Sequence, residues 1–219
     1  MNNLTEYLEQ YSLLSLEKQE KLARLIGEHT VDFDLEGGMI HFTEQCSFPF
    51  QVLGTESDNS LTWLWAWAEE QPDIPLNRLS SAYQVKDWGE KAGLPQFTMP
   101  SIDLTRADGR ALSIIASEIC GASSYYQDSY EGGAVFLLLF GEAIDRQPSF
   151  DAAGLQRQFT EVLSLYELNG RTALIAYLRK KGLSYSEEER ILHAELESGE
   201  KLSAKFDENG QVVAIEGDN

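Results

Sequence analysis

The fold class is decided by the segment Val31-Asp-Phe-Asp-Leu-Glu-Gly-Gly-Met-Ile-His-Phe42. Apolar and acidic residues alternate along its first half, which is typical of a strand with one buried face. Gly37 and Gly38 follow, and a second apolar stretch begins at Met39. Because a glycine pair favours the tight turn between antiparallel strands, the segment predicts a β-hairpin.

Helical and extended patterns flank this hairpin. Apolar residues recur every three to four positions over the first 27 residues, and Gly27 ends that helix. A second helix is expected from Pro75 to Gly93, and a third after the capping-box pattern Thr105-Arg-Ala-Asp108. Further strands are expected over residues 48–53, 61–68, 97–104 and 134–140.

Together these elements predict an α+β fold. We expect an antiparallel sheet with helices packed on one face, and a mixed sheet stays open as an alternative. The segment Asp145-Arg-Gln-Pro148 is the expected boundary, since a helical pair and a β-meander follow it. The predicted domains are a main domain over residues 1–145 and a small C-terminal subdomain over residues 149–219. The second part either stands alone or extends the first sheet.

The chain is strongly acidic, with 17 Lys and Arg against 36 Asp and Glu and a net charge of −19. Nucleic acids and anionic membranes attract basic side chains, so neither is an expected partner. Solubility alone is the simplest explanation of the charge. Two cysteines, an N-terminus without signal-peptide features and no long apolar run favour a cytoplasmic location.

Motifs of the common enzyme classes are absent from the sequence. There is no Gly-x-Ser-x-Gly, no phosphate-binding glycine loop and no His-x-x-x-His or Cys-x-x-Cys pair. We therefore assign no catalytic residue, no metal ligand and no cofactor. If the protein is an enzyme, carboxylates would do the acid–base chemistry, and Glu118 and Asp103 would be tested first.

Acidic residues concentrate around the hairpin. Between Arg24 and Arg78 the chain has ten acidic residues and no Lys or Arg. Asp32, Asp34 and Glu36 alternate with apolar residues, so we expect them together on the outer face of their strand. Such a surface suits a basic protein. The first hypothesis is therefore a non-enzymatic binding protein, immunity- or inhibitor-like, for a basic toxin or nuclease.

Aromatic residues carry a second hypothesis, a small-molecule binding domain. Alternating tryptophans of one strand would project from the same face. We favour a role in the core for them, and a cleft between them and a tyrosine-rich loop stays open. The candidate cleft residues are Trp63, Trp65, Trp67, Tyr125, Tyr126 and Tyr130.

The tryptophan segment Leu61-Thr-Trp-Leu-Trp-Ala-Trp-Ala68, with the helix over residues 111–121 and the tyrosines after it, resembles an uncharacterised bacterial family of unknown function, numbered 6882. The resemblance extends over residues 1–145. In that family an Asn often follows the last alanine, where this chain has Glu69. The resemblance implies a bacterial, cytoplasmic protein, and it implies no activity. Oligomeric state is left unassigned.

Overall fold

A computed structural model describes residues 3–43, 46–68 and 74–218. The chain divides into two compact units. Among the described residues, unit 1 comprises those between 18 and 147, and unit 2 comprises residues 3–17 together with residues 148–218. The division falls inside the first helix, α1 (Leu4–Ile26), so residues 3–17 belong with the C-terminal part of the chain. The predicted domains, residues 1–145 and residues 149–219, instead assign residues 3–17 to the first part of the chain, and that division stays a prediction.

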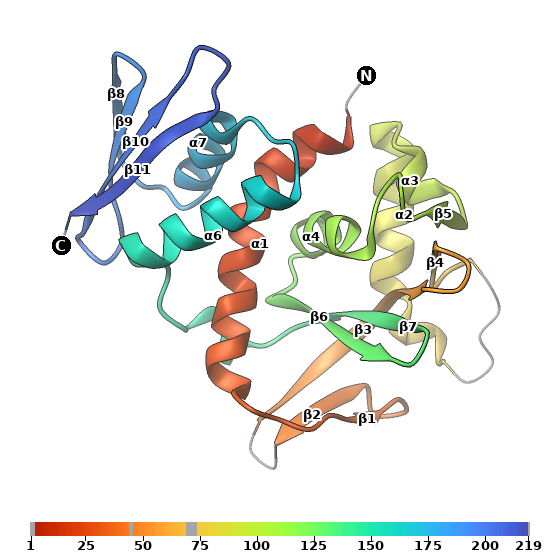
Figure 1. The fold of residues 1–219 in the computed structure, drawn as a ribbon. Coiled ribbons are helices and arrows are strands. Elements are labelled where there is room, and N and C mark those ends of the chain that lie inside the picture. Colours follow the sequence, from red (N-terminus) through yellow and green to blue (C-terminus); the bar gives the residue numbers. More distant parts are fainter. Residues whose placement is uncertain (1–2, 44–45, 69–73, 219) are drawn as a thin grey trace. The chain divides into compact units, whose positions relative to one another are not determined.

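The described residues of unit 1 form a seven-stranded sheet whose pairings are all antiparallel (Figure 1). Five strands are neighbours in chain order: β1 (Asp32–Asp34), β2 (Met39–Thr43), β3 (Cys46–Ser57), β4 (Thr62–Trp65) and β5 (Ser101–Asp103). On the other side of β3 lie β7 (Gly133–Leu139) and then β6 (Ser124–Tyr130). Asp34 pairs with Met39, so the predicted hairpin is confirmed.

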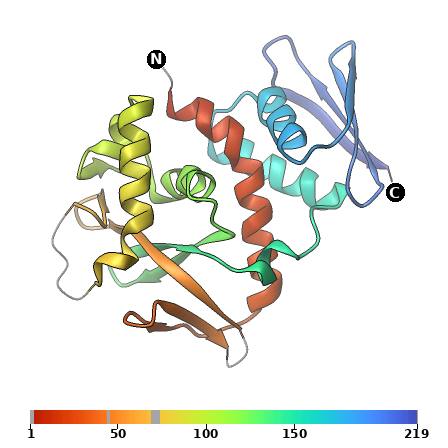
Figure 2. The same cartoon turned by 180° about the vertical axis from the view of Figure 1, so that it is seen from behind.

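Helices pack against this sheet, and the predicted α+β class is confirmed (Figure 2). In unit 1, α4 packs against β3, β6 and β7, and α2 packs against β3. The helices that follow α1 in this unit are η1 (Leu76–Arg78), α2 (Ser80–Ala92), α3 (Pro95–Thr98), α4 (Gly109–Ile119) and α5 (Glu142–Asp145). Gly93 ends α2 in the left-handed conformation, as expected for a helix C-terminus.

The strand expected over residues 97–104 is shorter than predicted. Pro95 begins the short helix α3, because a proline fits the first turn of a helix. Phe97 lies in that helix and is fully buried. Pairing with β4 is confined to Ser101–Asp103.

The prediction that Thr105 is the N-cap of α4 is also wrong. The N–H and hydroxyl of Thr105 both donate to Oδ1 of Asp103, at 2.8 and 2.6 Å. Thr105 is therefore held in a turn before the helix. The N-cap is Asp108, whose Oδ1 accepts a hydrogen bond from the N–H of Ala111 at 2.6 Å.

A cluster of aromatic and aliphatic side chains from β2, β3 and β7 forms the core on one face of the unit 1 sheet. Burying one such side chain contributes about 1.5–3 kcal/mol. Its central members are Ile40, Phe42, Phe50, Val52, Leu137 and Leu139. This core holds the β1–β2 hairpin through Phe33, whose ring packs edge-on against Phe50 with centroids 6.2 Å apart.

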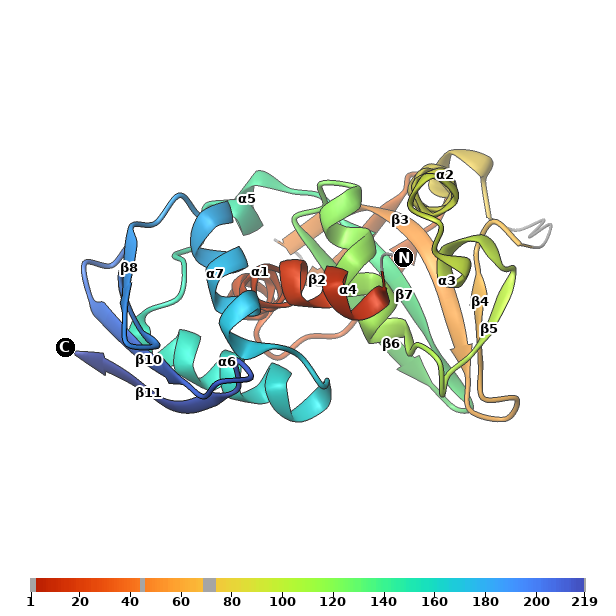
Figure 3. The same cartoon turned by 90° about the horizontal axis from the view of Figure 1, so that it is seen from above.

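Unit 2 combines helices with a four-stranded antiparallel meander, and the predicted C-terminal helical pair and β-meander are confirmed (Figure 3). Helix α6 packs against β11. Buried side chains alternate along β9 and β10, which is the pattern of strands with one covered face. The elements are α6 (Ala152–Leu165), α7 (Gly170–Lys180), β8 (Tyr185–Glu188), β9 (Ile191–Glu195), β10 (Lys201–Phe206) and β11 (Val212–Asp218).

A buried carboxylate ties residues 3–17 to the rest of unit 2. The Glu17 side chain is 5% exposed and accepts hydrogen bonds from the Tyr177 hydroxyl at 2.5 Å and the Phe150 N–H at 3.3 Å. Nζ of Lys181 lies 3.0 Å from Glu17 and 3.0 Å from Glu197. Burial lowers the pKa of Lys181, but hydrogen bonds to these two carboxylates outweigh burial and raise it.

Candidate functional site

The acidic hairpin is exposed, but its three carboxylates differ in their roles. Asp32 and Asp34 lie on β1, an edge strand, whereas Glu36 lies in the turn and not on the strand. Oδ1 of Asp34 accepts a hydrogen bond from the N–H of Gly37 at 2.8 Å and so closes the turn. Asp32 and Glu36 point into solvent and hold no such bond among the described residues.

One basic side chain, Arg78 of η1, packs against this turn. Its Nη2 donates to the carbonyl of Glu36 at 2.9 Å, and its Nε lies 3.4 Å from the carbonyl of Leu35. The guanidinium fits because Gly38 has no side chain: a Cβ there would lie 1.9 Å from Cζ of Arg78. Arg78 therefore stabilises the hairpin through carbonyls and leaves the carboxylates uncovered.

The described acids in the rest of this stretch differ in their exposure. Glu44, Glu69, Glu70 and Asp73 lie outside the described residues. Glu28 and Asp58 are exposed, and Glu56 turns inward from β3. Asp32 and Asp34 lie two positions apart on β1, and Glu36 follows them in the turn.

Glu56 is partly buried. Its Oε1 accepts a hydrogen bond from the N–H of Gly109, at the first turn of α4. Burial raises the pKa of Glu56, the Gly109 N–H opposes this, and the carboxylates of Asp108 and Asp58 raise it again. Gly109 is 53 positions from Glu56 in the sequence, and no motif connects the two. The contact between them was therefore not predicted from the sequence.

The tryptophans do not line a cleft together. Trp63 and Trp65 have no exposed surface; their rings meet edge-to-face with centroids 5.1 Å apart, and Trp63 also packs on Phe136. β4 ends at Trp65, where a turn closed by the Ala68 N–H begins, so Trp67 leaves the row. Trp67 is half-buried, with Nζ of Lys86 4.4 Å from its ring centroid. The favoured role in the core is confirmed for Trp63 and Trp65.

The predicted tyrosine loop is a strand, β6, and its alternation separates the tyrosines. Tyr125 is buried, whereas Tyr126 projects from the opposite face and packs edge-on against Phe42. The hydroxyl of Tyr126 lies 3.2 Å from Nε2 of His29. Tyr130 ends the strand and is 53% exposed. The cleft expected between the tryptophans and these tyrosines is therefore not formed by these residues.

The two carboxylates named for acid–base chemistry have structural partners. Glu118 lies 2.5 Å from Nζ of Lys18, which also donates to the carbonyl of Ala122. Asp103 accepts two hydrogen bonds from Thr105, and these lower its pKa. Glu118 is therefore part of an ion pair, and Asp103 is part of a turn.

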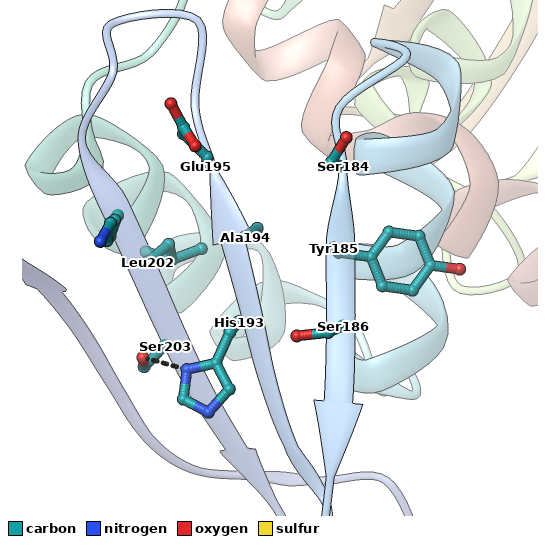
Figure 4. A pocket seen from close by; sticks show the side chains of 9 residues that line it. Ser184, Tyr185, Ser186, His193, Ala194, Glu195, Leu202 and Ser203 are labelled. Carbon is teal, nitrogen blue, oxygen red and sulfur yellow. Dashed lines mark hydrogen bonds between the residues drawn. The ribbon is translucent and has the colours of Figure 1, made fainter.

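An open groove of about 630 Å³ lies on the outer face of the unit 2 meander (Figure 4). Nδ1 of His193 lies 2.8 Å from Oγ of Ser203, directly across from it on β10. The same cross-strand contact recurs in unit 1, where Nδ1 of His41 lies 2.7 Å from Oγ of Ser47. Because the pair recurs as an ordinary strand-to-strand contact, it is not a sign of a nucleophilic serine.

Comparison with known proteins places the chain in a family. A family model described as "Family of unknown function (DUF6882)" matches residues 5–141, which is more than half of the sequence. The chain belongs to DUF6882. No curated protein and no solved structure matches it. The DUF6882 match includes the hairpin and the tryptophan segment, and it confirms the resemblance predicted from the latter.

No described helix of this DUF6882 member is both long enough and apolar enough to cross a membrane.

Proposed function

We propose that this DUF6882 protein is a non-enzymatic binding protein that holds a basic protein through the carboxylates of its β1–β2 hairpin. One observation supports the proposal: Asp32 and Glu36 are exposed and have no ion-pair partner among the described residues. Carboxylates without an internal counter-charge attract and orient an external cationic surface. The partner class is a basic toxin or nuclease in the bacterial cytoplasm, as in immunity or inhibitor proteins.

Four basic side chains of unit 1 have partners away from these carboxylates. Lys18 pairs with Glu118, and Lys86 lies over the ring of Trp67. Other pairs are Arg24 with Glu20 and Arg146 with Glu142. Arg78 contacts the hairpin itself, and the hydrogen bonds that it makes with the described residues go to carbonyls. A partner that brings several lysines or arginines gains contacts with these carboxylates.

The test is affinity capture from bacterial lysate with the tagged protein and a charge-reversed hairpin, Asp32→Lys/Glu36→Lys. Asp34 is retained because its carboxylate closes the turn. The matched control is Glu167→Lys/Glu208→Lys, which changes two exposed acids of unit 2 and gives the same net charge. At about 50 mM salt we expect basic proteins on the wild type and the control and none on the hairpin variant; at about 500 mM salt binding is screened.

Two outcomes would contradict the proposal. Equal loss of capture in the hairpin variant and in the unit 2 control would mean that net charge alone attracts the proteins. Absence of any basic, salt-sensitive partner on the wild type would remove the function itself.

The other two hypotheses have weaker support. Trp63 and Trp65 are fully buried and therefore do not line a small-molecule cleft. Support for the enzyme hypothesis is weaker because Glu118 is ion-paired and Asp103 is held in a turn.

A further inference from the structure

We infer that the first half of α1, residues 3–17, is a docking helix whose partner in this chain is the module formed by residues 148–218. The module is held by specific contacts on one face of the helix. It therefore stays bound without a covalent connection to the rest of the chain. Glu9 and Glu17 are the residues that select it.

The boundary of the DUF6882 match separates this half of α1 from the segment that it packs with. The match includes α1 from residue 5 onward and ends at residue 141, so residues 148–218 lie outside it. Residues 3–17 nevertheless form one compact unit with residues 148–218. We expect this arrangement where an added module binds a surface of a domain.

One face of α1 carries the contacts with the module. Glu9, Leu13 and Glu17 recur every four residues and so share a face of the helix, where Leu13 is 1% exposed. Oε1 of Glu9 accepts a hydrogen bond from the N–H of Asn169 at 2.8 Å, and Glu17 accepts one from the N–H of Phe150 at 3.3 Å. The two glutamates therefore bind backbone groups of the module on both sides of α6.

The buried charge of Glu17 makes the docking selective. A buried carboxylate is costly unless its surroundings supply hydrogen bonds and a counter-charge. The module supplies both, through the hydroxyl of Tyr177 at 2.5 Å and Nζ of Lys181 at 3.0 Å. Nζ of Lys181 also donates to Oγ of Ser149 at 2.7 Å, which fixes its position. A surface without these groups would leave Glu17 buried and unpaired, so the helix discriminates against it.

The end of α7 provides the groups that the helix recognises. Tyr177 and Lys180 lie in its last turn, and Lys181 is its C-cap. Nζ of Lys180 lies 4.7 Å from the ring centroid of Tyr11 on α1, a second cationic contact with the docking helix. The partner that fits α1 is therefore a helical module that presents a tyrosine hydroxyl and two adjacent lysines at a helix C-terminus.

The test uses the full-length protein with a protease site inserted between Gln147 and Pro148, cleaved after folding. The N-terminus carries a donor fluorophore and the C-terminus an acceptor. We expect energy transfer to persist after cleavage, and to decay over hours once an excess of unlabelled cleaved protein is added, because modules exchange between copies. Glu17→Gln should exchange at least about tenfold faster, since its amide carries no charge for Lys181.

Three further variants serve as controls. Glu6→Gln, at an exposed position of the same helix, should exchange at the wild-type rate. Lys181→Met should exchange faster. Glu17→Gln/Lys181→Met should exchange more slowly than the product of the two single effects predicts, because the two groups interact directly. If circular dichroism shows that uncleaved Glu17→Gln does not fold, Tyr177→Phe takes its place, since it removes only a hydroxyl from the same contact.

Three outcomes would overturn the inference. Separation of the two pieces on cleavage would mean that the covalent link holds the module. Exchange too slow to detect over days would mean that the module is a permanent part of the core. Wild-type exchange in Glu17→Gln would mean that Glu17 does not select it. Asp32→Lys/Glu36→Lys should exchange like the wild type, so failure here leaves the hairpin proposal intact, and the reverse also holds.

Discussion

Carboxylates that look alike in the sequence have separate roles in the folded protein. Asp34 closes a turn, Glu118 pairs with Lys18, and Glu56 accepts a backbone N–H at the start of α4. Asp32 remains exposed. What each group can do is set by its neighbours, because burial and hydrogen bonds shift a pKa in opposite directions.

Glu56→Gln should raise the stability of the protein at neutral pH. The pKa of Glu56 is higher in the folded protein than in the unfolded chain, where it is near 4.3. The free energy of unfolding therefore falls as the pH rises from the unfolded-state pKa through the folded-state pKa. Gln cannot ionise, yet its carbonyl can still accept the Gly109 N–H. We expect a higher Tm for Glu56→Gln than for the wild type at pH 7, and nearly equal values at pH 4.

Asp58→Asn is the matched control for this prediction. It removes an exposed carboxylate from the same end of the sheet, so its effect on Tm should be small. A wild type more stable than Glu56→Gln at pH 7 would show that the ionised carboxylate is favoured at this position.

At the scale of elements, α4 shows that the residue capping a helix depends on what precedes the helix. Thr105 and Asp108 both suit an N-cap in sequence, and Thr105 is already bound to Asp103. Asp108→Ala should therefore cost about 1 kcal/mol of unfolding free energy, since it leaves the Ala111 N–H without its acceptor. Urea unfolding followed by circular dichroism measures the difference.

Thr105→Ala provides the comparison, because both substitutions truncate a capping-type residue to Ala. The Thr105 side chain makes an exposed hydrogen bond in the turn before α4, so Thr105→Ala should lower the free energy of unfolding by less than about 0.5 kcal/mol. A larger loss of unfolding free energy for Thr105→Ala than for Asp108→Ala would support the capping box predicted from the sequence.

Elements with a strong hydrophobic period were predicted well. The hairpin, α2, α4, β7 and the C-terminal meander follow alternation or helical spacing together with glycine stops. The strand β6 was missed because Tyr125 and Tyr126 were interpreted as a loop, and pairing with β7 makes this segment extended. Such pairing between strands depends on neighbours in space, which local propensity does not contain.

At the scale of the whole molecule, α1 contributes to both units, and Glu17 is the last residue of its unit 2 part. Burial raises the pKa of Tyr177, and the carboxylate of Glu17 raises it further. Glu17→Ala would leave the Tyr177 hydroxyl and one contact of Lys181 without an acceptor. We expect it to destabilise unit 2 by about 2 kcal/mol.

Hydrogen exchange can locate that loss. Amides of α7, β9 and β10 should exchange faster in Glu17→Ala, while those of β3 and β7 in unit 1 should keep their wild-type rates. Glu6→Ala, an exposed position of the same helix, is the control and should change neither set. Uniform acceleration over both units would mean that the two parts unfold as one.

The sequence by itself determined the α+β class, the β-hairpin at residues 31–42, the concentration of acids around it and membership in DUF6882. These properties follow from local periodicity, composition and motif, which are contained in short stretches of chain. Tertiary structure alone decided that Trp63 and Trp65 are buried, that Arg78 holds the acidic turn, and that Glu17 pairs with Lys181 inside unit 2. The physical reason is that burial and pairing depend on which distant segments pack together.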